Sequence, residues 1–397
     1  MSINRPKSSG EPAIDAARTA PAKAAKLAIK HNKLRESAMG DIAFGFQAAP
    51  ASDVHKSDQT LYREVMEDCA LGQKLGYDAA WLLEHHFSDY YPTPSPLLFM
   101  AHIAAAFPGL SLGTSVLVLP WYHPLRLAEE IAMLNSMTTG TLHLGIGRGT
   151  AKMEYDAYNV DMNEARARFA ECYRIVEKGL AGEPFTHDGH FWKIERPIRL
   201  RPEPVPKKVR FYGAIGSPAS AEVMGDLGVA PICLSTFPDK LLARILERWS
   251  ARAGAAAHDA ILPISVKMFI ADTDEEALAL GRRYYPPYFD LQCAHYESDS
   301  NPWADIPEYQ DFSRMFANLR KLTDAAELGP FMDSNLVGSP ATICRRIDQL
   351  AALGFNYFMV SCATPGTPIG LRQRMMTRFA EEVCPRYSQS MRRKQAA

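Results

Sequence analysis

Few features of this 397-residue sequence suggest a secreted, membrane-embedded or nucleic-acid-binding protein. Its seven cysteines are scattered, their number is odd and no Cys-x-x-Cys pair occurs, so neither a disulfide framework nor a zinc cage is predicted. No apolar stretch reaches transmembrane length, and residues 1–40 lack the apolar core of a signal peptide. The formal net charge of −1 argues against nucleic acid or an anionic membrane as the main partner. We therefore expect a globular protein of the reducing cytoplasm.

Residues 1–40 are polar and rich in alanine and lysine, and a basic helix over residues 13–38 is compatible with their composition. A polar terminus of this kind predicts a flexible or loosely attached tail. The alternative is an arm that packs on a partner subunit.

From Asp41 onward, strand-like and helix-like segments alternate along the chain. Strands are expected at residues 42–47, 79–83, 112–119, 142–146, 209–215, 229–234, 264–270 and 357–360. Helices are expected at residues 59–76, 96–107, 124–137, 164–180, 218–227, 239–253 and 340–353, with further helices opening over 274–283 and from Pro368. About eight strands separated by helices predict an α/β fold of the (β/α)8 barrel type over residues 41–390. A doubly wound sheet is the alternative.

Two segments interrupt the alternation. Residues 184–200 contain Asp188-Gly189 between β-prone residues, which predicts a hairpin outside the barrel. Residues 284–330 are irregular and aromatic, and they precede the last strand. A long insertion at this position suits either an active-site lid or ordinary packing of an irregular excursion.

The expected strand 142–146 ends in glycines and one arginine, Gly145-Ile-Gly147-Arg148-Gly149. The dinucleotide fingerprint Gly-x-Gly-x-x-Gly fails here, because its third glycine is replaced by Thr150. Glycines let the backbone approach a ligand closely, and an arginine offers a fork of donors to a phosphate. The alternative is a tight turn with a solvated arginine.

The expected strand 209–215 ends in Gly216-Ser217-Pro218-Ala219-Ser220. Ser217 suits the N-cap and Pro218 the first position of a helix. A helix N-terminus with free N–H groups binds phosphate, although most such sequences are plain caps.

Glu84-His85-His86 follows the second expected strand. Adjacent histidines at a strand end point in opposite directions, so at most one of them faces the barrel mouth. That histidine suits a general acid or base, whereas the other is expected to be structural. No metal site is predicted, because His-Glu-x-x-His is absent, and a hydrolase has little support because Gly-x-Ser-x-Gly is absent.

Taken together, these strand ends resemble the bacterial luciferase-like family of flavin-dependent monooxygenases. The resemblance spans roughly residues 41 to 385 and depends on the order and spacing of several short motifs. They are Trp81-Leu-Leu-Glu84-His85-His86-Phe87, Gly113-Thr114-Ser115-Val116-Leu-Val-Leu-Pro120 with His123-Pro124 and Ala128-Glu129, Gly145-Ile-Gly147-Arg148-Gly149 with Glu154, Gly216-Ser217 with Ser220, and Val337-Gly338-Ser339-Pro340 with Gly354-Phe355.

The resemblance implies a (β/α)8 barrel that binds reduced FMN at its C-terminal mouth. It implies that Arg148 and the helix start at Gly216, Ser217 and Ser220 hold the flavin phosphate. It places Ser115–Val116 beneath the isoalloxazine ring, often through a non-prolyl cis peptide, puts Glu154 near the same pocket and matches His85 to the family's catalytic histidine. A dianionic phosphate does favour an arginine together with a helix N-terminus.

The implied activity is that of a two-component monooxygenase. A separate flavin reductase supplies reduced FMN, O2 adds to give a C4a-peroxyflavin, and a small organic substrate such as an aldehyde, ketone or terpenoid-like molecule is oxygenated. Light-emitting members have a cysteine where this chain has Gly147, which weakens the case for luminescence. The alternatives are F420-dependent hydride transfer and a flavin-binding protein without turnover. The resemblance also implies a homodimer packed through barrel helices.

Overall fold

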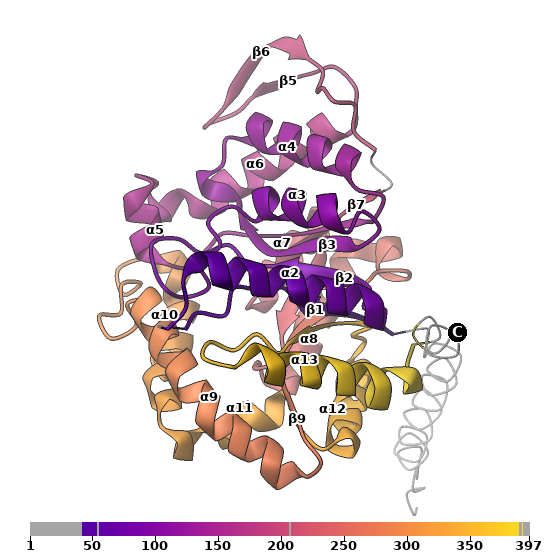
Figure 1. Ribbon diagram of the computed structural model, residues 1–397. Helices are drawn as coiled ribbons and strands as arrows, with labels where there is room; N and C mark the ends of the chain where they lie inside the picture. The colour runs from indigo at the N-terminus through magenta and orange to yellow at the C-terminus, as the bar shows by residue number, and fades with distance from the viewer. Residues whose placement is uncertain (1–41, 54, 206–207, 389–390, 392–397) are drawn as a thin grey trace, which may run out of the picture. The chain divides into compact units, whose positions relative to one another are not determined.

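The computed structural model describes residues 42–53, 55–205, 208–388 and 391, and most of them form a parallel barrel surrounded by helices (Figure 1). In ring order, the strands are β1 (Ala43–Gln47), β2 (Ala79–Leu82), β3 (Ser111–Val118), β4 (Leu142–Gly147), β7 (Val209–Ala214), β8 (Ala230–Leu234), β9 (Pro263–Ile270) and β11 (Tyr357–Ser361). The ring closes because β11 pairs in parallel with β1. The (β/α)8 barrel is therefore confirmed and the doubly wound sheet is wrong. The expected N-terminal tail lies outside the described residues.

Helices follow the strands as the sequence predicts. They are α2 (Asp58–Leu75), α3 (Pro96–Ala106), α4 (Pro124–Met137), α5 (Lys152–Ala157), α6 (Ala165–Leu180), α7 (Pro218–Asp226), α8 (Asp239–Ala253), α9 (Asp274–His295), α10 (Gln310–Phe316), α11 (Gly329–Ser334), α12 (Pro340–Leu353) and α13 (Ile369–Arg378). Their ends have local causes: α2 begins at the capping side chain of Ser57 and ends at Gly76, whose φ of +90° suits glycine. The expected hairpin is also present, as antiparallel β5 (Phe185–Asp188) and β6 (Lys193–Ile198).

The segment before the last barrel strand differs from the prediction. Helix α9 begins at a capping box formed by Thr273 and Glu276 and extends to His295, far beyond residue 283. It continues through two prolines because its aromatic side chains are buried against the barrel, and this burial offsets the missing backbone donors. A short strand, β10 (Leu336–Gly338), then pairs with β9 outside the ring, and the sequence did not predict it.

Four large side chains fill the barrel at the end where the strands begin, which we call the barrel floor: Trp81, His143, Tyr212 and Tyr357. Their rings contact one another, with Trp81 lying 5.5 Å from His143, 6.0 Å from Tyr212 and 5.6 Å from Tyr357 between ring centroids. Glycines at positions 45 and 113 leave the space that the indole occupies, since a Cβ at either position would lie within 2.6 Å of it. The floor is thus a closed, packed layer.

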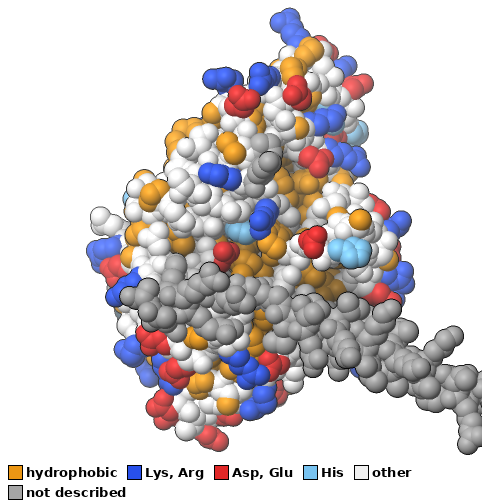
Figure 2. Space-filling model, turned by 90° about the vertical axis from the view of Figure 1, so that its right-hand side faces the viewer, with side chains coloured by type: hydrophobic (Ala, Val, Ile, Leu, Met, Phe, Trp, Pro, Cys, Tyr) orange, Lys and Arg blue, Asp and Glu red, His pale blue; other side chains and the backbone are white. Residues whose placement is uncertain are grey.

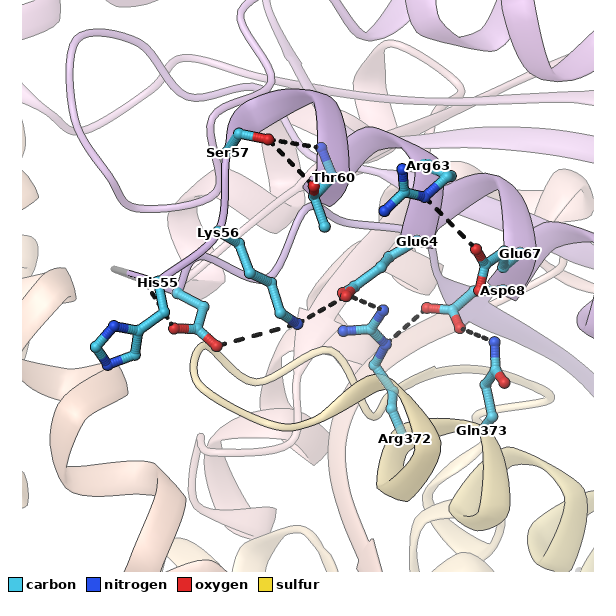
Figure 3. A network of polar contacts seen from close by, with 11 residues as sticks. His55, Lys56, Ser57, Thr60, Arg63, Glu64, Glu67, Asp68, Arg372 and Gln373 are labelled. Carbon is cyan, nitrogen blue, oxygen red and sulfur yellow. Dashed lines mark hydrogen bonds and ion pairs between the residues drawn. The ribbon is translucent and has the colours of Figure 1, made fainter.

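A buried ion cluster holds α13 against α2, the first and last helices of the described barrel (Figure 3). The guanidinium of Arg372 donates to Asp68 at 2.7 Å and lies 3.4 Å from Glu64, which also pairs with Lys56 at 2.7 Å. A cation this deeply buried needs charged partners, so the cluster fixes how α13 packs against α2 on the outside of the barrel.

Acidic, basic and hydrophobic side chains are interspersed on the face shown in Figure 2. Among the described residues, no helix is long and apolar enough to cross a membrane. All seven cysteines are described, and each is buried with a free thiol.

Candidate active site at the barrel mouth

The opposite end of the barrel, where the strands finish, is the barrel mouth, and it remains accessible to water. Side chains alternate between the two faces of a strand, so the position two residues beyond each floor residue also faces the lumen. Ala214 follows Tyr212 in this way and is exposed, and Leu234, two residues beyond the lumenal Ile232, is 43% exposed. Ser115 and Val116 are partly exposed at the end of β3. An open mouth above a closed floor is the arrangement that a barrel enzyme uses for its active site.

His85 and His86 point in different directions, as expected. His86 is buried; its Nε2 lies 3.2 Å from Glu84, and its Nδ1 lies 3.0 Å from the Tyr158 hydroxyl. Glu84 also accepts hydrogen bonds from the Val118 N–H and the Trp121 indole, so this side of the pair is structural. His85 is partly accessible and contacts aromatic rings instead.

His85 meets two side chains that are distant in the sequence, Glu154 and His295. One nitrogen of each imidazole and a carboxylate oxygen of Glu154 all lie within 4.8 Å of one another. The Glu154 Oε1 atom accepts the backbone N–H of His86 at 2.7 Å and lies 3.6 Å from Nε2 of His295. His295 is fully buried; its Nδ1 bonds Ser88 at 2.7 Å, whereas its Nε2 has no hydrogen-bond partner in the described part of the chain.

Burial shifts the pKa values of this cluster so that the uncharged form of each group is favoured. It raises the pKa of Glu154 to about 7 and lowers the pKa of His295 to about 4. The pKa of His85 is also well below its usual value, because burial disfavours its charged form and because His295, His86 and Lys267 lie where they oppose a further positive charge. At neutral pH, His85 is therefore a free base beside a carboxyl group whose raised pKa lets it hold a proton in the neutral range.

Arg148 is not the solvated arginine of the alternative interpretation. Its Nη1 donates to Glu308 at 2.9 Å, and its guanidinium lies over the Tyr309 ring at 5.0 Å. Arg166 donates to the same carboxylate oxygen at 2.9 Å. Two guanidinium groups therefore share one carboxylate, and the group keeps a net positive charge that can attract an anion.

The helix start after β7 lies beside the end of β4. A Cβ placed on Gly147 would lie 3.7 Å from the Cβ of Ala214, so the segments that carry Arg148 and Ser217 leave neighbouring strands. The Ser217 hydroxyl accepts the N–H of Ser220 at 3.2 Å, which is the N-cap that the sequence predicts. Gly216, Ser217 and Ser220 are all partly accessible. The two predicted phosphate-binding segments are thus brought together.

The peptide bond between Ser115 and Val116 is cis, as the resemblance implied. The Val116 side chain lies against Gly147, where an added Cβ would be only 2.7 Å from the Val116 Cγ2 atom. Gly147 is therefore required by the packing of its neighbour, which gives a physical reason for glycine at this position.

The insertion between α9 and β10 packs on the loop after β4. The Trp303 indole donates to the carbonyl of Thr150 at 2.7 Å, and the Tyr309 hydroxyl donates to that of Gly149 at 3.1 Å. In Figure 1, α5 and α10 accordingly lie at the same end of the barrel. Trp303 and Tyr309 are fully buried, so these aromatics pack a core while they border the mouth.

Two site residues were not predicted, His295 and Lys267. His295 lies at the end of the part of α9 that the sequence left irregular, and Lys267 lies within an apolar strand. For Lys267, the available signal was a single lysine at a lumenal position of this apolar strand. The grouping of two imidazoles with Glu154 is also a ligand set that suits a divalent transition metal, and the sequence analysis predicted no metal site.

An eight-stranded parallel barrel with titratable groups gathered at its mouth defines the class: a (β/α)8 enzyme. The sequence profile of the luciferase-like monooxygenases matches residues 42–357, and the chain belongs to this family. It is 23% identical over 361 residues to the oxygenase component of the flavin-dependent trigonelline monooxygenase of Acinetobacter baylyi, covering 84% of this chain and 92% of that protein. The solved structure of the monooxygenase RslO1 from Streptomyces bottropensis superposes with a TM-score of 0.74 at 25% identity, over 87% of this chain and 100% of that one.

Solved structures with the same fold bind two kinds of cofactor. The oxygenating constituent of 3,6-diketocamphane monooxygenase from Pseudomonas putida, in complex with FMN, has a TM-score of 0.67 at 22% identity, over 87% of this chain and 98% of that one. An F420-dependent secondary alcohol dehydrogenase has a TM-score of 0.66 at 15% identity, over 86% and 98%. The family therefore establishes an oxidoreductase of the luciferase-like type.

Proposed function

We propose that this protein is a monooxygenase that uses reduced FMN from a separate reductase, together with O2, to oxygenate a small and largely apolar organic substrate. The observation that carries the proposal is that Arg148, the helix start at Ser217 and a neutral His85 all follow the C-terminal ends of barrel strands. An aldehyde, a ketone or a terpenoid-like molecule fits such a site. The related oxygenase component from Acinetobacter baylyi supports the need for a reductase partner.

The residues at the mouth fit FMN. Arg148 and the first turn of α7 at Gly216, Ser217 and Ser220 would hold the phosphate, because positive charge and free helix N–H groups both favour a dianion. Ser115 and Val116 would lie beneath the ring system. When bound, the reduced flavin supplies the electrons that activate oxygen.

His85 is the residue that we assign to proton transfer. As a neutral imidazole at the mouth, it can accept a proton from the reacting group and return it at a later step. Glu154 lies beside it and can hold a proton near neutral pH, because burial raises its pKa to about 7. The buried His295 ring packs on His85, with ring centroids 4.8 Å apart, and so helps to keep water away.

A second candidate is hydride transfer with the deazaflavin F420, which the F420-dependent dehydrogenase of the same fold supports. The two functions differ in their dependence on oxygen. A third possibility, flavin binding without turnover, would leave the titratable cluster without a chemical role.

The deciding experiment is anaerobic titration with reduced FMN and, separately, with reduced F420, followed by rapid mixing with O2 while the absorption spectrum is recorded. The proposal expects tight binding of reduced FMN and a transient spectrum that differs from both reduced and oxidised FMN. A compound that accelerates the decay of this transient identifies a substrate. Binding of F420 with no reaction with O2 would support hydride transfer, and binding of FMN without a transient would support the non-catalytic alternative.

We also propose a homodimer formed through barrel helices. Leu98 on α3 is 74% exposed, and Met133 and Met137 on the neighbouring helix α4 are 51% and 49% exposed. Large apolar side chains on adjacent helices are typical of a contact between subunits. Sedimentation should show a dimer, and Met133→Glu should convert it to a monomer, whereas Ala243→Glu, at an exposed position of α8 after β8, should not.

A further inference from the structure

Lys267 is a lumenal cation at the barrel mouth for which the proposed reaction has no role. It lies on β9 in register with Ser361 of β11, and Ser361 comes two residues after Met359, which packs among the lumenal side chains of the floor. The strand alternation therefore directs both Ser361 and Lys267 into the lumen above the floor. Ser361 is fully buried, whereas Lys267 remains partly accessible.

All of the contacts made by the Lys267 ammonium are with neutral groups. Its Nζ lies 3.2 Å from the Tyr91 hydroxyl and 3.4 Å from the Ser361 hydroxyl. The Tyr91 hydroxyl donates its own proton to the carbonyl of Ala363, so it presents an oxygen lone pair to the lysine. The ring faces of Tyr91 and Tyr288 lie 5.3 Å and 4.6 Å from Nζ. No carboxylate among the described residues lies within ion-pairing distance.

The two buried arginines in the described part of the chain do have acids. Arg372 pairs with Asp68 and Glu64, and Arg346 pairs with Asp239. The ammonium of Lys267 is held by hydroxyls and aromatic faces, which orient a charge but do not neutralise it. Burial without a counter-ion accordingly lowers the pKa of Lys267 to about 7. An anion arriving from the mouth would supply what the protein lacks.

We propose that Lys267 determines specificity by pairing with a carboxylate of the organic substrate. This inference rests on the proposed function in placing the substrate at this mouth. Aromatic rings surround the cation, because Tyr91 and Tyr288 face its Nζ, and Tyr90 packs on both of these rings and on His85. Leu234 lies on the adjacent strand β8. The substrate is thus an organic acid with an apolar body. His85 and Lys267 both contact the Tyr91 ring, so a substrate paired with Lys267 would lie close to His85.

The competing source of negative charge is the reduced flavin. Its phosphate belongs to Arg148 at the end of β4, and β7 and β8 separate that strand from β9. Its ring system carries a negative charge when reduced, so an anionic flavin ring is the alternative partner that the experiment must distinguish.

The test uses the full chain without flavin and two matched pairs of probes: benzoate with benzamide, and hexanoate with hexanamide. Calorimetric affinities at pH 7 should favour the carboxylate over the amide by about tenfold or more in at least one pair, because a hydrogen bond to a charged group is involved. Lys267→Met should abolish this preference, and Lys267→Arg should keep most of it. Lys240→Met, on the exposed side of α8, is the control that should change nothing.

Equal affinities for carboxylate and amide in both pairs would overturn the proposal, as would a preference that survives in Lys267→Met. A parallel anaerobic titration with reduced FMN separates the two anions: Lys267→Met should leave this affinity within about twofold. If the variant instead loses reduced FMN while its benzoate affinity is unchanged, the cation belongs to the flavin. Because the probe measurements need no flavin, they remain informative even if the chain does not bind FMN.

Discussion

The barrel floor and the barrel mouth are two layers of the same lumen, and they differ in whether their polar side chains have partners. On the floor, every polar side chain has a partner: the Trp81 indole donates to Tyr357 at 3.2 Å, Tyr357 donates to Asp78 at 2.8 Å, and His143 bonds Tyr212 at 3.0 Å. At the mouth, within the part of the chain that the structure describes, His295 has a ring nitrogen without a hydrogen-bond partner and Lys267 has no acid in contact. Satisfied polar groups stabilise a fold, whereas unsatisfied ones are available to a ligand.

The first prediction compares a histidine-to-alanine substitution in each layer, at His85 of the mouth and at His143 of the floor. His85→Ala should lower the rate of substrate oxygenation by about 10²- to 10⁴-fold, the usual loss when a general acid–base residue is removed. The unfolding free energy should change by about 1 kcal/mol or less, since His85 is partly accessible. His143→Ala should do the reverse: it breaks a buried hydrogen bond, costs about 1–3 kcal/mol of stability and leaves the rate per folded molecule unchanged.

Stopped-flow oxidation of bound reduced FMN gives the rates, and urea unfolding gives the stabilities. Full coupled oxygenation in the His85→Ala variant would remove our assignment of that residue. Equal losses of activity in both variants would mean that floor and mouth are not functionally separate.

The second prediction concerns the floor alone. Trp81→Ala should reduce the unfolding free energy by about 3–5 kcal/mol, because the indole fills the space left by Gly45 and Gly113 and no neighbouring side chain can replace it. The urea midpoint measures this loss, and the affinity of the folded fraction for reduced FMN should not change. A loss of stability below about 1 kcal/mol would show that the floor tolerates a cavity and is not the stabilising layer.

The third prediction uses the pH dependence of stability to test Glu154. The folded carboxyl keeps its proton up to pH of about 7, whereas an unfolded glutamate loses it near its ordinary pKa. Its contribution to the unfolding free energy is therefore fully present at pH 4 and is lost as the pH rises through 7, by about 3 kcal/mol. Glu154→Gln should remove this loss.

The measurement is the difference between wild type and variant over pH 4 to 8. The difference is required because His295, whose pKa is lowered to about 4, contributes a slope of the opposite sign. Glu195→Gln on the exposed hairpin is the control. Parallel stability curves for wild type and Glu154→Gln would contradict a raised pKa.

The strands and helices of the barrel were largely predictable from the sequence and the mouth only in part, for a physical reason. Strand periodicity and helix caps are local signals, so α4, α8 and α12 begin and end where the sequence places them. The segments around Arg148 and Ser217 were found because each follows a strand, and adjacent parallel strands bring such ends together. His295 and Lys267 enter the site through tertiary packing. Two prolines masked the continuation of α9, and the lysine in the apolar strand β9 was a local signal that does not show which side chains Lys267 meets.

The smallest expected effect tests whether Glu308 competes with the flavin phosphate for Arg148. The Arg148 Nη1 atom donates to the Glu308 carboxylate at 2.9 Å, at the position proposed for the flavin phosphate. The carboxylate and the phosphate would therefore compete for Arg148. Partly exposed ion pairs of this kind contribute about 0.2–1 kcal/mol, so Glu308→Gln should tighten reduced FMN by about two- to fivefold. Riboflavin, which has no phosphate, should bind equally well to both proteins. Arg148→Ala should weaken FMN but not riboflavin, and an unchanged FMN affinity in that variant would remove the phosphate assignment. Tightening of both flavins by Glu308→Gln would instead indicate that Glu308 acts on the shape of the mouth and not on its charge.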